Sequence, residues 1–337
     1  MRTSLLVACV LLALACGVAP YRARTRTYFV RAEPVRWSFM PEGYDSVIGQ
    51  RPQSPWGDSL VYPMLHYVGY TDSTFSTPTA RPPWLGILGP TLRALTGDTI
   101  RVVFRNATRQ PLSMHPHGVR YNAENEGALY NPPRGGGDSV TPGGTYTYNW
   151  LAGRESGPEG RELSSKVWLY HSHVHPETEI EEGLVGAIIV ADPARANAVT
   201  AVPTDVEREF ITFWMVFDEN GPTSPPRDAE MNLKHSINGL FFGNLRGLTM
   251  AKGDRVRWYV TALGSENDLH TPHWHGAKLQ LDGREEGYID VIELLPGSMK
   301  VADMVARNPG VWMLHCHVND HMAAGMYTTY TITDGAR

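Results

Sequence analysis

Cysteine is scarce in this chain of 337 residues, and its scarcity excludes a protein held together by disulfides. Only Cys9, Cys16 and Cys316 are present, and the first two lie in or next to an apolar N-terminal stretch. The rest of the chain therefore has one cysteine and no internal disulfide. Cys316 has histidine on both sides, a setting typical of a metal thiolate and not of an inert buried thiol.

The sequence also has no strong excess of charge of either sign and no apolar run of membrane-spanning length. The net charge is −5, and 19% of the residues are charged. A nucleic-acid-binding domain would present a basic face or stripe, so the charge argues against that class. The apolar run from Ser4 to Ala15 is well short of the about 20 residues that a spanning helix needs. We expect no transmembrane helix after removal of the N-terminal stretch.

Residues 1–16 have the layout of a secretory signal peptide, with one early arginine, an apolar run and small residues near a cleavage site. A retained membrane anchor is the alternative. Acylation of Cys16 after cleavage would make the chain a lipoprotein. We therefore expect export to the periplasm or the cell exterior, and lipid anchoring through Cys16 is left open.

Short β-branched and aromatic runs recur along the rest of the chain, whereas long runs with helical period do not. The runs are bounded by Gly, Pro, Asn and Asp, as is typical of strands joined by turns. The clearest are residues 99–104, 145–148, 186–190, 255–260 and 327–332. This pattern predicts an all-β fold built from sandwiches.

The chain repeats itself once, with the same elements in the same order. His-Pro-His-Gly at 115–118 matches His-Trp-His-Gly at 273–276. Tyr-His-Ser-His-Val at 170–174 matches Leu-His-Cys-His-Val at 314–318. A repeat at this spacing indicates two copies of one β domain.

The repeat predicts the domain boundaries. Domain 1 is expected at residues 24–192 and domain 2 at residues 206–337. A segment with prolines at 193 and 203, within residues 191–205, is the expected linker. Each domain is large enough to bury its own core.

Ten of the thirteen histidines fall in four short clusters, and His66 and His175, outside them, are expected to be structural or surface residues. His-x-His in a strand puts both imidazoles on one face, because side chains alternate with period two. A single pair is consistent with coincidence, but four pairs at matched places in a repeat predict one polymetal site. Imidazole suits copper, zinc, iron and nickel, and a thiolate beside two imidazoles and a methionine suits copper. The clusters are 115/117, 171/173, 270/273/275 and 315/317/321.

These clusters resemble the signature of the multicopper oxidases. The resemblance is closest to the A domains of ceruloplasmin and hephaestin, and the chain is also similar to small two-domain laccases. It extends over nearly the whole body, for example Ile237-Asn238-Gly239, Asp268-Leu269-His270-Thr271 and the tail from His315 to Ile332. It implies two cupredoxin-like domains, each a Greek-key β-sandwich.

The resemblance also implies four coppers per chain. The implied type 1 ligands are His270, Cys316, His321 and the axial Met326. The implied type 2 ligands are His115 and His273. The type 3 pair would be held by His117, His171 and His317 on one copper and by His173, His275 and His315 on the other. Electrons would pass from the type 1 copper through Cys316 to its flanking histidines, and O2 would be reduced to water.

The repeat predicts that only domain 2 has a type 1 site. The domain 1 residues aligned with His270, Cys316, His321 and Met326 are Leu112, Ser172, Glu177 and Glu182. Domain 1 therefore keeps cluster ligands alone. Small two-domain members of the family form trimers whose clusters lie between domain 1 of one subunit and domain 2 of the next, so the resemblance implies a homotrimer.

Three residues match the iron ligands of ceruloplasmin-like ferroxidases, namely Glu230, His235 and Asp320. Oxygen ligands suit iron; the alternative is that the two acids are solvated and the histidine is a polar strand end. Fe(II) is the expected reductant, and Cu(I) and phenols, the latter in a laccase-like activity, are the alternatives. A copper nitrite reductase, whose type 1 site would lie in domain 1, and a non-catalytic copper-binding protein are further alternatives.

Overall fold

The computed structural model describes residues 21–159, 163–220, 232–283 and 287–335. The predicted signal peptide at 1–16 lies outside them. The regular elements of the described part are mostly β-strands, and its helices are short, so the prediction of an all-β fold is confirmed. Within these ranges, no helix has the length and apolar character needed to cross a membrane.

The first half of the chain forms two four-stranded sheets, in the orders β2-β1-β4-β6 and β3-β8-β7-β5. A short helix, α1 (Pro176–Glu179), lies between β7 and β8. The strands are β1 (Thr25–Ser38), β2 (Val61–Tyr70), β3 (Leu92–Leu95), β4 (Thr99–Asn106), β5 (His115–Pro116), β6 (Thr145–Leu151), β7 (Ser165–His171) and β8 (Val185–Ala191).

The second half forms a five-stranded sheet, β10-β9-β12-β15-β14, and a four-stranded sheet, β11-β17-β16-β13. Helix α3 (Asn319–Ala323) lies between β16 and β17. The strands are β9 (Arg208–Asp218), β10 (Leu233–Ile237), β11 (Thr249–Ala251), β12 (Arg255–Ala262), β13 (Pro272–Trp274), β14 (Gln280–Leu281), β15 (Met299–Val305), β16 (Gly310–Cys316) and β17 (Tyr327–Thr333).

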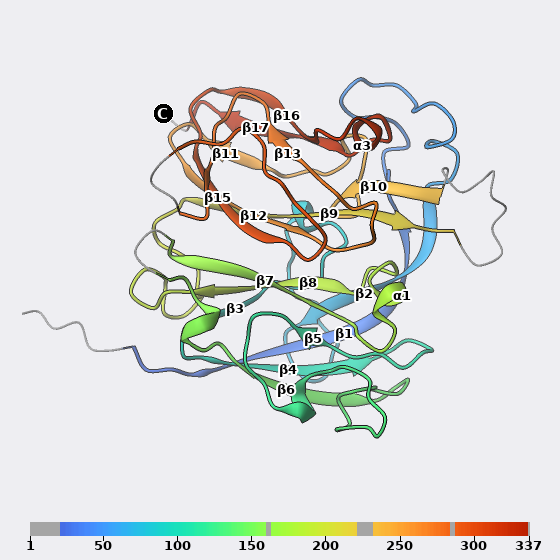
Figure 1. Ribbon diagram of the computed structural model, residues 1–337, viewed down its shortest axis with the longest axis vertical. Helices are drawn as coiled ribbons and strands as arrows, with labels where there is room; N and C mark the ends of the chain where they lie inside the picture. The colour runs from blue at the N-terminus through green and yellow to red at the C-terminus, as the bar shows by residue number, and fades with distance from the viewer. Residues whose placement is uncertain (1–20, 160–162, 221–231, 284–286, 336–337) are drawn as a thin grey trace, which may run out of the picture.

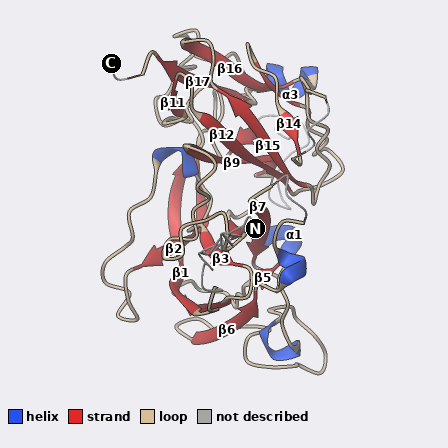
Figure 2. Ribbon diagram, turned by 90° about the vertical axis from the view of Figure 1, so that its left-hand side faces the viewer, coloured by secondary structure: helices blue, strands red, loops and turns tan. Residues whose placement is uncertain are grey.

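The two halves have the same pairing scheme. β1 pairs in parallel with β4, and β9 pairs in parallel with β12. β3 pairs in parallel with β8, and β11 with β17. The four sheets are stacked as layers (Figure 1), and the side view shows the same stacking of one half on the other (Figure 2). The internal sequence repeat is therefore a repeat of topology.

Strands β8 and β9 face two cores each, which explains their continuous apolar runs. Along β8, Ile188 and Val190 pack in the core of the first half, whereas Ile189 packs in a core shared with the second half. Along β9, Trp214 packs in the core of the second half and Phe213 in the shared core. A strand covered on both faces needs no polar alternation. Complete burial of each such side chain contributes about 1.5–3 kcal/mol.

Polar contacts at the rim of the shared core fix the two halves relative to each other. Arg257 of β12 is buried, and its guanidinium pairs with Asp303 at 2.7 Å and donates to Ser165 Oγ of β7 at 2.9 Å. Trp37 Nε1 of β1 donates to Gly239 O at 2.7 Å. The halves therefore form one packed body, and their metal-ligand candidates keep fixed positions.

Candidate metal centre

The His-x-His pairs lie at matching places in the two halves. β5 and β7 pair so that His115 is opposite His171. β13 and β16 pair so that His273 is opposite His315. Since side chains alternate along a strand, each pairing brings two His-x-His motifs onto one face. Each half thus presents a quartet of histidines, which are His115, His117, His171 and His173 in the first and His273, His275, His315 and His317 in the second.

The second-half quartet is preorganised for metal binding. His275 Nε2 and His315 Nε2 are 3.0 Å apart. Two ligand nitrogens that each lie about 2.0–2.1 Å from the same metal ion are separated from each other by about 3 Å or slightly more. The other ring nitrogens are held by backbone carbonyls: His273 Nδ1 lies 2.9 Å from Asp290 O, and His315 Nδ1 lies 2.7 Å from Cys316 O. These contacts leave Nε2 free for a metal.

The first-half quartet has the same geometry. His117 Nε2 and His171 Nε2 are 3.0 Å apart. His115 Nδ1 contacts Glu126 O at 2.7 Å, and His171 Nδ1 contacts Ser172 O at 2.8 Å. Burial, and to a lesser degree the neighbouring imidazoles, lower the pKa of His117 to about 4, so its ring is neutral at pH 7 and its lone pair is available.

The two quartets do not meet within one chain. Among the described residues, no ring contact or hydrogen bond joins a histidine of one quartet to a histidine of the other. β5 and β13 lie in separate layers (Figure 1). His275 and His317 are exposed, so the second quartet faces solvent. The two quartets are thus separate, and within the second the ligand atoms of His273, His275 and His315 lie within 4.8 Å of one another.

A buried trio lies beside the second quartet and has the donor set of a type 1 copper site. His270 precedes β13, Cys316 ends β16, and His321 lies in α3. Their ligand atoms all lie within 4.8 Å of one another, with His270 Nδ1 3.2 Å from His321 Nδ1. Met326 is also buried, and its carbonyl accepts from the Cys316 N–H at 3.0 Å. One thiolate, two imidazoles and a methionine fit copper.

The surroundings of Cys316 favour its thiolate. Burial would raise the pKa of the thiol, but hydrogen bonds with His270 and His321 and from the Thr271 N–H lower it to about 6. The Thr271 N–H lies 3.3 Å from Sγ. A thiol that ionises near neutral pH is ready to bind a metal ion.

Asp268 is a residue whose role near the trio the sequence did not reveal. It is completely buried, and its Oδ1 lies 3.2 Å from His270 Nε2 while accepting from the Val216 N–H at 2.7 Å. Its Oδ2 accepts from the Ser265 N–H at 2.7 Å. The carboxylate therefore holds the His270 ring with Nδ1 directed at Cys316 and His321. In the sequence, the position of Asp268 two residues before His270 was the feature that could have indicated this role.

The corresponding place in the first half has no such donor set. Leu112 forms an isolated bridge with Val140, just as His270 does with Leu294, so the aligned positions are equivalent. Ser172 Oγ accepts from a backbone N–H at 3.0 Å, and Glu182 accepts from Gln110 at 2.6 Å. Ser172 and Glu182 are therefore bonded to neighbouring protein groups, and Leu112 packs in the core.

Of the three iron-ligand candidates, His235 and Asp320 are described and Glu230 lies outside the described residues. His235 of β10 is 5% exposed, and its ring centroid is 4.9 Å from that of His321. Neither of its ring nitrogens has a hydrogen-bond partner within the described ranges. Burial, followed by His321 and His270, lowers its pKa to about 3. Asp320 is exposed in the first turn of α3.

Comparisons with known proteins agree with this arrangement. Two family models, each described as multicopper oxidase, match residues 85–195 and 217–336. The chain is 32% identical over 357 residues to the ferroxidase HEPHL1 of Mus musculus, which covers 96% of this chain and 30% of that protein. It is 34% identical over 339 residues to ceruloplasmin of Homo sapiens, and the match covers 91% of this chain and 30% of ceruloplasmin. The chain thus spans about three tenths of the length of these relatives.

Solved structures share the fold. A multicopper oxidase structure superposes with a TM-score of 0.65 at 20% identity, covering 92% of this chain and 89% of the other. A copper nitrite reductase from Nitrosomonas europaea superposes with a TM-score of 0.65 at 18% identity, covering 93% of this chain and 95% of the reductase chain. The predicted cupredoxin-like sandwiches are therefore confirmed.

Proposed function

Because this chain belongs to the multicopper oxidase family, we propose that it couples one-electron oxidation of a reductant to the four-electron reduction of O2 to water. The observation that carries the proposal is the buried His270, Cys316 and His321 trio, which is joined to the second quartet through Cys316. Bound copper would supply the redox chemistry. The chain supplies a covalent path, since Cys316 is bonded to both His315 and His317.

The proposal includes four coppers per chain, with the ligand sets given above. The Nε2 pairs at 3.0 Å support the type 3 assignment, because each joins two histidines expected on the same copper: His117 with His171, and His275 with His315. Each of these coppers then needs one more imidazole, His317 or His173, from the other domain. The two domains are those predicted at 24–192 and 206–337.

A homotrimer would complete these sites between subunits, because the two quartets of one chain do not meet. Exposed apolar residues beside both quartets support such an interface. Leu129 is 47% exposed and its N–H contacts His173 O at 3.4 Å, and Tyr288 is 65% exposed two residues before Asp290, the partner of His273. Apolar surface next to an unfinished ligand set is typical of a subunit interface.

We propose Fe(II) as the reductant, bound by Glu230, His235 and Asp320 next to His321. The supporting observation is the buried His235 imidazole, which has no hydrogen-bond partner among the described residues. Buried polar groups are rarely left without a partner, and a metal ion would supply one. His235 lies against the His321 ring, so an electron from iron would have a short path to the type 1 site.

The double variant Glu230→Ala/Asp320→Ala tests the iron site. We expect kcat/KM for Fe(II) to fall about 10–100-fold or more, the range for loss of groups around a metal, while kcat/KM for a methoxyphenol stays within about twofold. Steady-state O2 consumption measures both. Asp334→Ala, which removes another exposed acid of the second half, is the control. An unchanged Fe(II) rate would remove the iron-site proposal and favour Cu(I) or phenols.

Asp268→Asn tests the surroundings of the type 1 site. The neutral amide removes a negative charge that would stabilise oxidised copper, so we expect the reduction potential of the type 1 site to rise by about 60 mV. For a one-electron couple this corresponds to a tenfold change in the equilibrium constant for reduction. Redox titration of the blue band measures this. Asn267→Asp, an exposed neighbour, is the control, with little expected change. A potential that stays the same in Asp268→Asn would mean that this carboxylate does not tune the site.

A further inference from the structure

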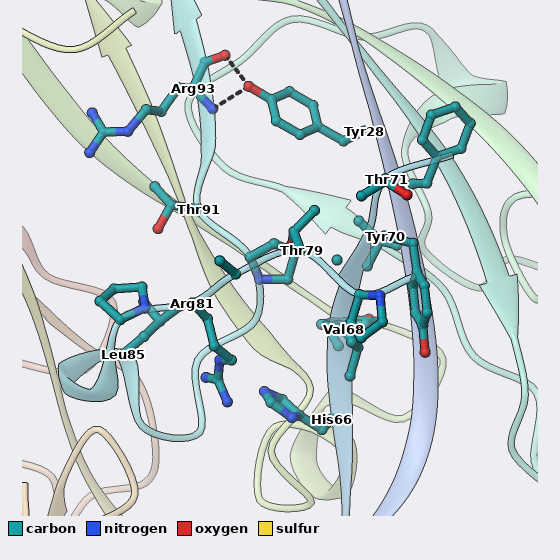
Figure 3. A pocket seen from close by; sticks show the side chains of 18 of the residues that line it. Tyr28, His66, Val68, Tyr70, Thr71, Thr79, Arg81, Leu85, Thr91 and Arg93 are labelled. Carbon is teal, nitrogen blue, oxygen red and sulfur yellow. Dashed lines mark hydrogen bonds between the residues drawn. The ribbon is translucent and has the colours of Figure 1, made fainter. Parts of the chain in front are cut away.

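A cavity of about 640 Å³ lies in the first half of the chain, away from the candidate copper ligands, none of which lines it. Its walls come from β1, β2, the 3-10 turn at Pro83–Leu85 and the start of β3 (Figure 3). Pockets that hold small molecules have volumes of about 300–1,000 Å³. The cavity is therefore large enough for a small organic ligand.

Most of the lining is apolar, and hydrogen bonds fix the position of Tyr28 within it. Val68, Trp84 and Leu85 supply hydrocarbon and ring surface. Tyr28 is fixed because its hydroxyl donates to Arg93 O at 2.6 Å and accepts from the Arg93 N–H at 2.8 Å, as the dashed lines in Figure 3 show. A preformed apolar wall favours a ligand with an apolar body.

Arg81, an exposed residue at the rim of the cavity, places a positive charge beside this wall. One guanidinium nitrogen, Nη2, donates to the carbonyls of Gly86 and Leu88 at 2.5 and 2.9 Å. In the part of the chain that the structure describes, no carboxylate lies within 4.0 Å of Arg81. Arg93, the other arginine of the lining, is paired with Glu209 at 3.0 Å. Arg81 thus keeps Nε and Nη1 for an anion.

His66 contributes a neutral, buried group next to this charge. It is 7% exposed, and Figure 3 shows its ring and the Arg81 guanidinium facing each other. Burial and the Arg81 charge lower its pKa to about 4, so it is uncharged at pH 7. The sequence predicted only a structural or surface residue at His66, whereas the structure places it in the wall of the cavity. The hydroxyls of Thr79 and Thr91 also line the cavity.

From this geometry we infer that the cavity binds a small organic carboxylate with an apolar body. The carboxylate would accept from Nε and Nη1 of Arg81, a planar fork that matches its two oxygens. The apolar body would lie against Val68, Trp84 and Leu85. Arg81 is exposed at the rim of the cavity, and a carboxylate paired with its charge is favoured over a neutral isostere. The site does not depend on the oxidase activity.

Isothermal titration calorimetry on the copper-loaded full chain tests this, with 2-naphthoate as the probe and 2-naphthamide as its neutral isostere. We expect saturable binding of 2-naphthoate at one site per chain, weakened at least about tenfold in Arg81→Gln. We expect 2-naphthamide to bind weakly and equally to both proteins. Arg101→Gln, an exposed arginine of β4, is the control and should bind like wild type.

Thr91→Asp provides a second test if Arg81→Gln folds poorly. It adds a negative charge to the cavity wall that would repel the carboxylate of 2-naphthoate, so the same loss is expected. Equal affinity of 2-naphthoate for wild type and either variant would overturn the inference, as would the absence of saturable binding up to about 10 mM. Anion binding at copper would be unaffected by Arg81→Gln, so only the Arg81-dependent part of the heat supports the site.

Discussion

Cys316→Ser is expected to abolish both the intense blue absorption band and steady-state O2 consumption. The serine oxygen cannot replace the thiolate that gives a type 1 copper its colour, and the variant lacks the sulfur through which electrons would pass from that copper to His315 and His317. Loss of groups that merely orient metal ligands costs about 10–100-fold, so loss of a ligand should cost more than about 100-fold. Visible absorption and an oxygen electrode measure the two effects.

The internal repeat provides a matched control. Ser172 occupies in the first half the position of Cys316 in the second, and its hydroxyl oxygen accepts from the Ser113 N–H at 3.0 Å. Ser172→Ala should therefore keep the blue band and most of the activity. A Cys316→Ser protein that still turned over O2 at more than a few per cent of the normal rate would contradict the proposed electron path.

Mixing two inactive variants is expected to restore activity, which is the second large effect. His171→Ala damages only the first quartet, and His275→Ala only the second. Each variant alone should be inactive, since every cluster in its homotrimer lacks a ligand. In mixed trimers, an interface that joins an intact first quartet to an intact second quartet would hold a complete cluster.

The expected recovery follows from random assembly. With equal amounts of the two chains, half of the first quartets and half of the second quartets are intact, so about a quarter of the interfaces are complete. O2 consumption of co-expressed variants, compared with the wild type at equal protein, measures this fraction. Co-expression of two copies of the His171→Ala chain is the control and should give no activity. Activity that stays at zero in the mixed sample would contradict a cluster shared between subunits and remove the trimer proposal.

Much of the fold could be predicted from local patterns. The runs at 99–104, 255–260 and 327–332 lie within β4, β12 and β17, because β-branched and aromatic residues between turns suit strands. Burial alternates along β4 and β17, whereas β12 is buried along nearly its whole length. The repeat also predicted the shared topology, since the two halves match in the order of their elements. The apolar runs of β8 and β9 did not reveal that each strand faces two cores.

The sequence by itself determined which residues are able to bind copper, because the ligand types and their period-two spacing are local properties of the chain. It could not decide which of them meet, since that depends on contacts between residues far apart in the chain. Only the tertiary structure placed Asp268 against His270 and His235 against His321. It also placed Arg81 at the rim of an apolar cavity, with no carboxylate of the described residues within 4.0 Å. It also kept the two quartets apart, because the shared apolar core packs the halves rigidly together. The Cys316 motif therefore marks the proposed electron path, while the packing of the sheets keeps the two quartets of one chain apart, so that the proposed oxygen-reducing cluster needs a second chain.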